Sequence, residues 1–453
     1  MTQNGSQDKI SEFADSDVDI VQMEIPDVNG ALRGKFCTVD KVKPTSKSAV
    51  CTVLYQMTPV DDVWTSIHSS YDNGFPDVLG LPDIETAIIL PWRTGQGAVI
   101  YDVHNLDHSP FPLASRNVLK SVAKRFEQTG YEPKFGVEFE CFVMHEDNDL
   151  MARGEHRKMT GLGRLSNAYR LNQADEAREL GAEFIRRMAS IGITVEVFHT
   201  ELGDGAVEFA LSPENALRAA DNAVRAKTYF KELCAERGLV ATFMAKWDAD
   251  QAGCGGHIHQ SLWRDGKNVF KDTDSDDLSK AARSYIAGML ATMADTGVIF
   301  RPFPNSYRRF DHESWSPENA SWGYDNRSAA LRAITYPSDA AYRVEHRVPG
   351  ADVNLYLSIA AMLAGGLYGV LNNLELSAAA EGNATKEDRF QRLPSTLPSS
   401  TDAFRKSEFC RDYFGDAFVD HFAASRDVEW EYWCDWQKKN VTAFELDRYF
   451  ETV

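Results

Sequence analysis

Residues 135–142 read Phe-Gly-Val-Glu-Phe-Glu-Cys-Phe, and this stretch decides the fold class and the place of a site. Apolar side chains recur at every second position, which is typical of a β-strand with one face in the core. Glu138 and Glu140 therefore share the other face. Two neighbouring carboxylates repel each other unless a cation or a proton compensates them. The stretch predicts either a solvated strand face or one wall of a cation site.

Two further stretches alternate titratable and apolar side chains in the same way. Residues 257–259 read His-Ile-His and follow residues 253–256, Gly-Cys-Gly-Gly, whose glycines would let the backbone approach a ligand closely. Residues 343–347 read Arg-Val-Glu-His-Arg, which places two arginines and a glutamate on one face. Taken alone, the His-Ile-His stretch is also compatible with a solvated strand face, and residues 343–347 with ordinary ion pairing.

A fourth segment, residues 196–208, carries Glu196, His199, Glu201, Asp204 and Glu208, with a glycine-rich turn between the last acids. Together the four segments indicate a polar cavity more strongly than any one of them. Carboxylate oxygens suit Mg²⁺ or Mn²⁺, and a histidine ligand is compatible with Mn²⁺. A cysteine-rich zinc site is not indicated.

Local positive charge comes from residues 301–350, which contain seven arginines and no lysine. Arginine is favoured where planar, bidentate contacts to carboxylate or phosphate are needed. Six acids share the window, so a surface ion-pair network is the alternative. Acids for a divalent metal beside arginines for anions indicate metal-dependent phosphoryl transfer. The chain has no P-loop motif.

The overall composition narrows the function and the compartment. The chain has 453 residues, with 48 Lys+Arg against 67 Asp+Glu and a net charge of −19, which argues against nucleic-acid binding and against docking on anionic membranes. The N-terminus has no apolar signal region, and the uncharged stretch 353–374 is interpreted as a buried helix. Seven scattered cysteines without a C-x-x-C pair indicate a reduced, cytoplasmic protein.

Strand and helix patterns predict an α+β fold with a boundary near residue 112. Residues 19–24 and 32–39 read as strands around the Asn29-Gly30 turn, a strong hairpin signal. Ser212-Pro213-Glu214 predicts the start of a helix that runs to Gly238, and the Pro/Ser/Thr-rich segment 382–402 predicts an exposed loop. Further helices are expected at 116–129, 174–191 and 277–297. Mixed elements without a regular βαβ rhythm favour α+β over a doubly wound sheet.

Motifs spread in order over nearly the whole chain resemble the glutamine synthetase superfamily. They are residues 27–35, 136–140, 241–246, 253–262, 305–309, 326–328 and 343–349. The resemblance implies an N-terminal β-grasp domain (17–112) and a catalytic domain (113–453) built on a curved antiparallel sheet. It also implies a homo-oligomer of stacked rings, with a dodecamer as the expected assembly and active sites formed between neighbouring subunits.

The resemblance also implies roles for individual residues. The first metal would be held by Glu140, Glu201 and Glu208, and the second by Glu138, His257 and Glu345. The ATP-binding positions would be Glu196, His259, Ser261, Arg332 and Arg343. Glutamate would be held at Gly253, Arg309 and Arg347, while Arg327 would contact substrate and stabilise the transferring phosphoryl group.

The chain departs from true glutamine synthetases at the ammonium site. Trp315 occupies the position of an acidic flap residue, and residues 54–59 replace an acid-containing motif with Leu-Tyr-Gln-Met-Thr-Pro. A tryptophan there suggests an apolar wall suited to an organic amine, with interface packing as the alternative role. Tyr55 and Trp64 are further candidates for this pocket.

The resulting prediction is an ATP-dependent, Mg²⁺- or Mn²⁺-using ligase that joins L-glutamate to a primary amine through γ-glutamyl phosphate. Trp315 and Arg327 are its expected catalytic residues, and an alkylamine or amino alcohol is the expected substrate. Glutamine synthetase using ammonia is one alternative. A polyamine ligase is another, with Asp61, Asp62 or Glu313 binding the second ammonium. A non-catalytic scaffold or nitrogen sensor is the third, disfavoured because all six expected metal ligands are present.

Overall fold

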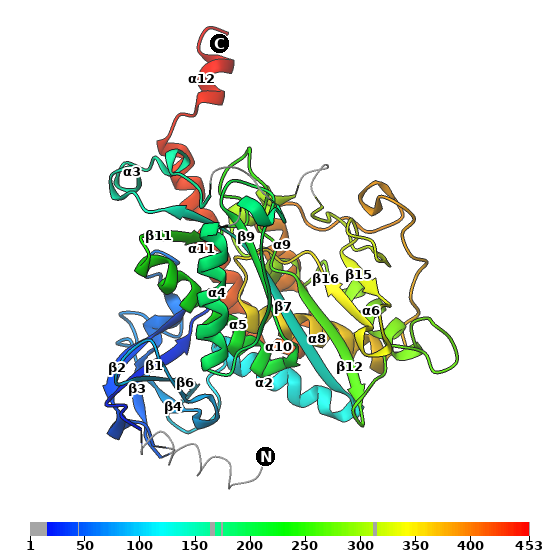
Figure 1. Ribbon diagram of the computed structural model, residues 1–453, viewed down its shortest axis with the longest axis horizontal. Coiled ribbons are helices and arrows are strands. Elements are labelled where there is room, and N and C mark those ends of the chain that lie inside the picture. The colour runs from blue at the N-terminus through cyan, green and yellow to red at the C-terminus, as the bar shows by residue number, and fades with distance from the viewer. Residues whose placement is uncertain (1–15, 44, 164–167, 174, 311–314, 453) are drawn as a thin grey trace.

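The computed structural model describes residues 16–43, 45–163, 168–173, 175–310 and 315–452. Two β-sheets and a set of helices make up this part of the chain, which confirms the predicted α+β class. The smaller sheet, blue in Figure 1, lies at one end of the larger sheet and close to α5 (Ala216–Glu236). An ion pair of 2.8 Å between Glu24 of the small sheet and Arg225 of α5 joins the two parts.

The small sheet has six strands among the described residues, in the order β2-β1-β6-β4-β3, with β5 paired to β6. Its strands are β1 Ile20–Pro26, β2 Leu32–Thr38, β3 Ser48–Cys51, β4 Asp77–Pro82, β5 Ile88–Ile89 and β6 Gln96–His104. β1 pairs antiparallel with β2 and parallel with β6. The predicted hairpin is confirmed: Asp27 accepts hydrogen bonds of 2.9 Å from Asn29 N and Ala31 N, and Gly30 adopts φ 84°. The β-grasp assignment and the boundary at 112/113 stay predictions.

The large sheet has ten strands among the described residues, in the order β14-β15-β16-β12-β7-β9-β8, with three short strands attached to β7 and β12. These strands are β7 Glu132–His145, β8 Val195–Thr200, β9 Ala206–Leu211, β10 Glu214–Asn215, β11 Leu239–Thr242, β12 Ile258–Arg264, β13 Lys267–Asn268, β14 Trp322–Tyr324, β15 Leu331–Ile334 and β16 Arg343–His346. Among the strand pairs described in this sheet, only β14–β15 is parallel. The predicted antiparallel sheet is therefore confirmed apart from this edge.

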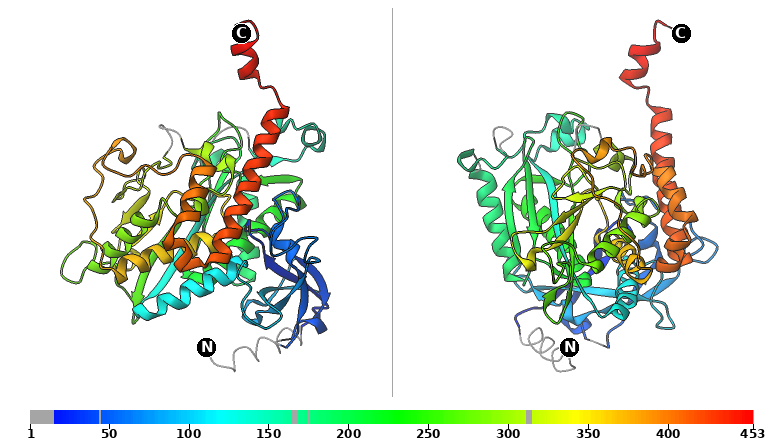
Figure 2. Two further views of the ribbon diagram at one scale, coloured as in Figure 1. Left: turned by 180° about the vertical axis from the view of Figure 1, so that it is seen from behind. Right: turned by 90° about the vertical axis from the view of Figure 1, so that its right-hand side faces the viewer.

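Helices cover the large sheet and form the C-terminal part of the molecule. They are α2 Ser115–Phe126, α3 Asn148–Ala152, α4 Asp175–Ser190, α5, α6 Lys280–Thr292, α7 Gly297–Phe300, α8 Leu355–Leu371, α9 Leu397–Lys406, α10 Glu408–Phe414, α11 Asp416–Lys439 and α12 Ala443–Tyr449. Figure 2 shows the orange-to-red helices α9 to α11 standing together beside the sheet.

The uncharged stretch 353–374 forms the buried helix α8, as predicted. It packs so closely on α6 that a Cβ at Gly288 would lie 2.1 Å from the carbonyl oxygen of Gly365. Small residues on both helices therefore allow the backbones to approach. No helix in the described ranges is long and apolar enough to cross a membrane.

Two expectations about local structure are wrong. The helix predicted from Ser212 begins at Ala216, because residues 214–215 pair with β7 and the side chain of Asn215 caps the helix at the nitrogen of Arg218. Ser212 instead donates a hydrogen bond of 2.7 Å to Glu196. Residues 397–402 of the expected loop (382–402) belong to α9, whose Thr396 cap and buried apolar side chains outweigh its Pro/Ser/Thr-rich composition.

Candidate active site

A cavity of about 640 Å³ opens beside the strands of the large sheet. Its walls carry acids, arginines and aromatic side chains from segments far apart in the chain. All six predicted metal ligands line it, as do all four predicted substrate-binding residues, Arg332 and Trp315. These residues are Glu138, Glu140, Glu201, Glu208, His257, Glu345, Gly253, Arg309, Arg327, Arg347, Arg332 and Trp315. Four of the predicted ATP-binding residues, Glu196, His259, Ser261 and Arg343, are not part of the lining.

The register of the strands places the acids. Glu140 of β7 lies directly opposite Glu208 of β9. On the other side of the sheet centre, Glu345 of β16 lies between His259 of β12 and Arg332 of β15. Directly paired residues have side chains on the same face and within contact distance. The alternation predicted from residues 135–142 therefore produces a wall of the cavity and not a solvated face.

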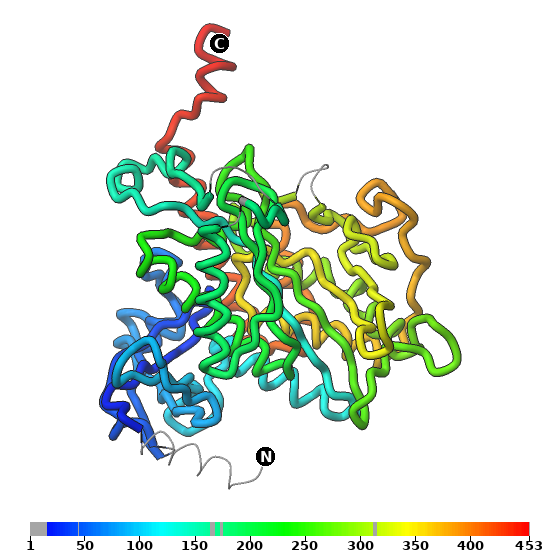
Figure 3. The backbone as a smooth tube through the Cα atoms, viewed as in Figure 1, coloured from blue at the N-terminus to red at the C-terminus, as the bar shows by residue number. Residues whose placement is uncertain are grey.

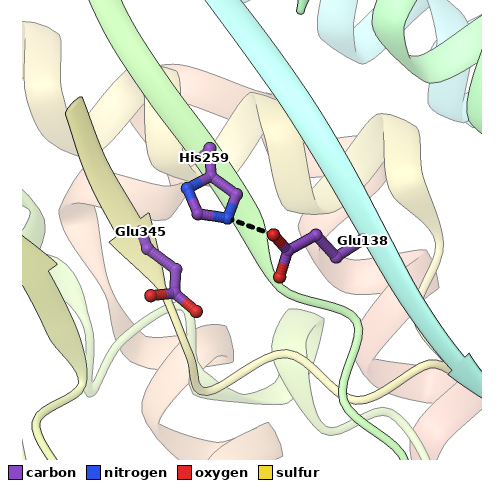
Figure 4. A group of neighbouring side chains, drawn as sticks. All are labelled: Glu138, His259 and Glu345. Carbon is purple, nitrogen blue, oxygen red and sulfur yellow. Dashed lines mark hydrogen bonds and ion pairs between the residues drawn. The ribbon is translucent and has the colours of Figure 1, made fainter. Parts of the chain in front are cut away.

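Glu138, His259 and Glu345 form one group whose ligand atoms lie within 4.8 Å of one another. Figure 4 shows the three side chains turned toward one another from β7, β12 and β16. His259 Nε2 donates to Glu138 at 2.7 Å, and Arg343 Nε donates to His259 Nδ1 at 3.1 Å. His259 is thus fixed as the Nε2–H tautomer by two partners.

His257 lies beside the same group. Its Nδ1 is 3.5 Å from Glu345 and 3.6 Å from Glu138, while Arg309 donates to its Nε2 at 3.2 Å. Both histidines thus approach the two carboxylates. The assignment of His257 to the metal and of His259 to ATP stays a prediction.

A second group contains a histidine that the sequence analysis did not assign. His199, Glu201 and Glu208 bring ligand atoms within 4.8 Å of one another. His199 lies 3.6 Å from Glu201 and 3.8 Å from Glu208, and its ring stacks on Tyr169 at 4.6 Å. Its position two residues before Glu201 was the available signal, because alternate residues of an extended segment point the same way. Glu140, the third predicted ligand of this metal, accepts a hydrogen bond of 2.6 Å from Gly255 N.

The titration of these acids reflects crowding of negative charge. Burial, followed by the charges of Glu138, Glu140 and the other nearby glutamates, raises the pKa of Glu208 to about 9. Glu345 is more deeply buried than Glu208, but Arg347 and the two histidines lower its pKa to about 2. Crowded carboxylates keep a proton when no cation compensates their charge, and a divalent metal ion would displace that proton. The five glutamates and one histidine among the predicted ligands fit hard cations such as Mg²⁺ or Mn²⁺.

Arginines line the cavity beside these acids. Arg347 contacts Glu345 at 2.5 Å and donates to the carbonyl oxygen of Arg327 at 3.0 Å. Arg332 contacts Glu345 at 3.1 Å. Arg309 packs on Gly253, where a Cβ would lie 2.7 Å from the Arg309 Cγ, so only glycine fits there without a shift. The arginines thus lie next to the acids, where phosphate and carboxylate groups would need them.

Two of the predicted ATP-binding residues have local partners outside the cavity. Glu196 is exposed and accepts the bond from Ser212 described above. Ser261 accepts a hydrogen bond of 2.9 Å from the indole of Trp263. Their roles stay predictions.

Trp315 is the aromatic residue of the predicted amine pocket that lines the cavity, and its side chain is 63% exposed. Tyr169, Leu202 and Phe142 line the cavity with it. The prediction of Tyr55 as a pocket residue is wrong for its own chain, because Tyr55 is fully buried in the core of the small sheet.

Trp64 also lies away from this cavity and packs on His421, with ring centroids 5.0 Å apart. Asp61 pairs with Arg33 at 2.6 Å, and Glu313 lies outside the described residues.

Comparison with known proteins identifies the family. Residues 112–449 match the family described as glutamine synthetase, catalytic domain. The chain is 35% identical over 447 residues to type-1 glutamine synthetase 2 of Dictyostelium discoideum, covering 94% of this chain and 82% of that protein. It is 32% identical over 458 residues to the glutamate–isopropylamine ligase of a Pseudomonas species, covering 98% of both chains. It is also 32% identical over 445 residues to the γ-glutamylethanolamide synthetase GlnA4 of Streptomyces coelicolor, covering 97% of this chain and 94% of that protein.

A solved structure gives the same result. The structure described as a GmaS/ADP complex superimposes with a TM-score of 0.82 at 25% identity and covers 97% of this chain and 99% of that chain. With three quarters of its length matched by the catalytic-domain family, the chain belongs to the glutamine synthetase family, whose members are ATP-dependent ligases that use divalent metal ions.

Proposed function

We propose that the protein ligates L-glutamate to a primary organic amine at the expense of ATP, giving a γ-glutamylamide, ADP and phosphate. The observation that carries this proposal is the cavity, in which the acids and arginines of the family occur together with Trp315 in place of an acid. The names of two relatives, an isopropylamine ligase and an ethanolamide synthetase, support an alkylamine or an amino alcohol as the second substrate.

Mg²⁺ or Mn²⁺ is the proposed metal, because the donors are mainly carboxylate oxygens. Glu140, Glu201 and Glu208 would hold one ion, and Glu138, His257 and Glu345 the other. Bound divalent ions would neutralise the phosphate oxygens and orient the nucleotide. The raised pKa of Glu208 fits this assignment, since a nearby cation removes the repulsion that keeps its proton in place.

The arginines would position and stabilise the reacting groups. Arg309 and Arg347, with the open backbone at Gly253, would hold glutamate so that its γ-carboxylate oxygen faces the γ-phosphorus in line with the leaving ADP oxygen. Arg327 lines the cavity and would stabilise the charge that spreads over the transferring phosphoryl group. Transfer forms γ-glutamyl phosphate, in which the acyl carbon carries a good leaving group.

The amine then attacks this acyl carbon and phosphate leaves. True ammonia enzymes bind ammonium with acids, whereas Trp315 would offer an apolar surface for the alkyl part of an amine. Trp315, Tyr169 and Leu202 would also keep water from the acyl phosphate, which hydrolyses readily.

Ammonia is the second candidate substrate, favoured by the 35% identity to a protein named as a glutamine synthetase. A polyamine substrate has less support, because Asp61 already pairs with Arg33.

We further propose a cytoplasmic homo-oligomer of stacked rings, a dodecamer. The C-terminal segment supports association: α12 leaves the body of the molecule (Figure 3), and Val441, Phe444 and Phe450 are each more than 60% exposed. An apolar segment of this kind gains free energy when a second subunit covers it.

Phosphate release tests the proposed function. The purified protein is incubated with ATP, MgCl₂ and glutamate, and with ammonia or an equal millimolar concentration of each amine in a panel. Faster release with methylamine, isopropylamine or ethanolamine than with ammonia is expected. If ammonia is faster than every amine, the protein is a glutamine synthetase.

A further inference from the structure

Three segments carry the proposed glutamate-binding residues Gly253, Arg309 and Arg347 and are hydrogen-bonded into one unit. They are residues 253–256, the 3₁₀ turn Pro304–Arg309 and residues 347–352. Arg309 donates to the carbonyl oxygens of Val348 at 3.1 Å and Pro349 at 3.2 Å. The nitrogen of Gly256 donates to Pro349 at 3.0 Å, and that of Ala351 to Cys254 at 3.1 Å. The orientation of Arg309 therefore depends on where residues 347–352 lie.

Lys227 of α5 holds residues 347–352 from one side. Its ammonium group donates a hydrogen bond of 2.6 Å to the carbonyl oxygen of Ala351. The same group lies 5.0 Å from the ring centroid of Phe243, within cation–π range. Lys227 does not line the cavity, so its role is not direct contact with substrate.

Asp352 joins these residues to the 3₁₀ turn. Its Oδ2 accepts a hydrogen bond of 2.6 Å from the hydroxyl of Ser306, three residues before Arg309. Its Oδ1 is buried and has no hydrogen-bond partner in the part of the chain that the structure describes. A Cβ at Gly350 would lie 2.5 Å from this oxygen, so the glycine makes room for the carboxylate.

We propose that Lys227 and Asp352 act as a pair of positioning residues for glutamate, holding Arg309, Arg347 and Gly253 in place from behind the cavity. This inference rests on the proposed function, since it takes glutamate as the ligand of that subsite. The two side chains carry opposite charges, and each acts electrostatically on the other. Removing one side chain leaves the charge of the other without its counter-charge, in surroundings with little water.

Four variants test this pair: Lys227→Met, Asp352→Asn, the double variant, and Lys231→Met as the matched control. Lys231 lies one turn further along α5, with its ammonium 6.0 Å from the same Phe243 ring. Lys227 and Lys231 therefore share the aromatic contact, while the bond of 2.6 Å to Ala351 belongs to Lys227.

The readouts are the KM values for glutamate and ATP and the glutamate-dependent rise in melting temperature, which needs no turnover. Each single variant at 227 or 352 is expected to raise the glutamate KM about tenfold and the ATP KM less than about twofold. In the double variant the glutamate KM is expected to rise by less than the product of the two single-variant rises, because both residues act on one unit. Lys231→Met is expected to match the wild type.

Equal rises in both KM values, or the same effect in Lys231→Met, would overturn the proposal. If Lys227→Met does not fold, Ser306→Ala removes the Asp352 contact together with the hydrogen bond from the nitrogen of Phe303, leaves Lys227 in place and must still raise the glutamate KM. Wild-type protein that binds glutamate but forms no amide refutes the proposed function, and the melting-temperature series still tests the pair. If the wild-type protein forms amides and Lys227→Met binds glutamate as the wild type does, only the positioning role of Lys227 and Asp352 is refuted.

Discussion

Metal binding should release a proton from Glu208. Its pKa of about 9 in the metal-free protein means that the carboxyl is protonated at pH 7.5 and must ionise to bind a cation. Removing that proton at pH 7.5 costs about 2 kcal/mol, from the difference of about 1.5 pH units. The Mg²⁺ affinity should therefore rise about tenfold per pH unit and level off above pH 9. The free energy of unfolding of the metal-free protein should fall as pH rises from about 4.5 to about 9. The reason is that the folded state binds the Glu208 proton more tightly than the unfolded state does.

Isothermal titration calorimetry with MgCl₂ measures this proton directly. Titrations at pH 7.5 in two buffers of different ionisation enthalpy should show about one proton released per protein chain. Glu208→Gln should abolish the release and flatten the pH dependence, while weakening binding. An affinity that is unchanged between pH 7 and 8, with no difference between the buffers, would show that Glu208 is already ionised and would refute the reasoning.

Three other variants make separate predictions. Glu140→Ala should lower amide synthesis by about 10³-fold without changing the oligomer mass in size-exclusion chromatography, because it removes a proposed metal ligand; retained activity contradicts the metal assignment. Trp315→Glu should raise the ratio of ammonia to isopropylamine turnover, and the free energy of unfolding should change by less than about 0.5 kcal/mol, since the side chain is 63% exposed; an unchanged ratio removes Trp315 from the amine site. Deleting residues 441–453 should reduce the oligomer mass measured by light scattering, and an intact assembly would show that α12 is not an interface.

Periodicity in the sequence was sufficient to predict the strands that carry the acids. Glu138 and Glu140 on one face of β7 follow from the alternation of residues 135–142, and the cavity confirms it. The β1–β2 hairpin was also predictable from local sequence, because an Asn-Gly pair between two strand-like runs strongly favours a tight hairpin turn.

Contacts between distant segments were harder to predict. His199 lies close to Glu208 because the pairing of β8 with β9 places these two residues opposite each other. Neither strand's sequence alone predicts this register. Tyr55 looked like a pocket residue from its motif position, yet it packs on Phe111 in the core of the small sheet. The helix start expected at Ser212 failed because its hydroxyl has a partner in another strand, Glu196. Long-range hydrogen bonds of this kind override local propensity.

Isotope transfer tests the central claim most directly. Glutamate labelled with ¹⁸O in its γ-carboxylate is incubated with the protein, ATP, MgCl₂ and isopropylamine, and the products are weighed by mass spectrometry. Ligation through γ-glutamyl phosphate predicts γ-glutamylisopropylamide and the transfer of one ¹⁸O atom to each phosphate released. Unlabelled phosphate, or no amide under conditions in which ammonia yields glutamine, would contradict it.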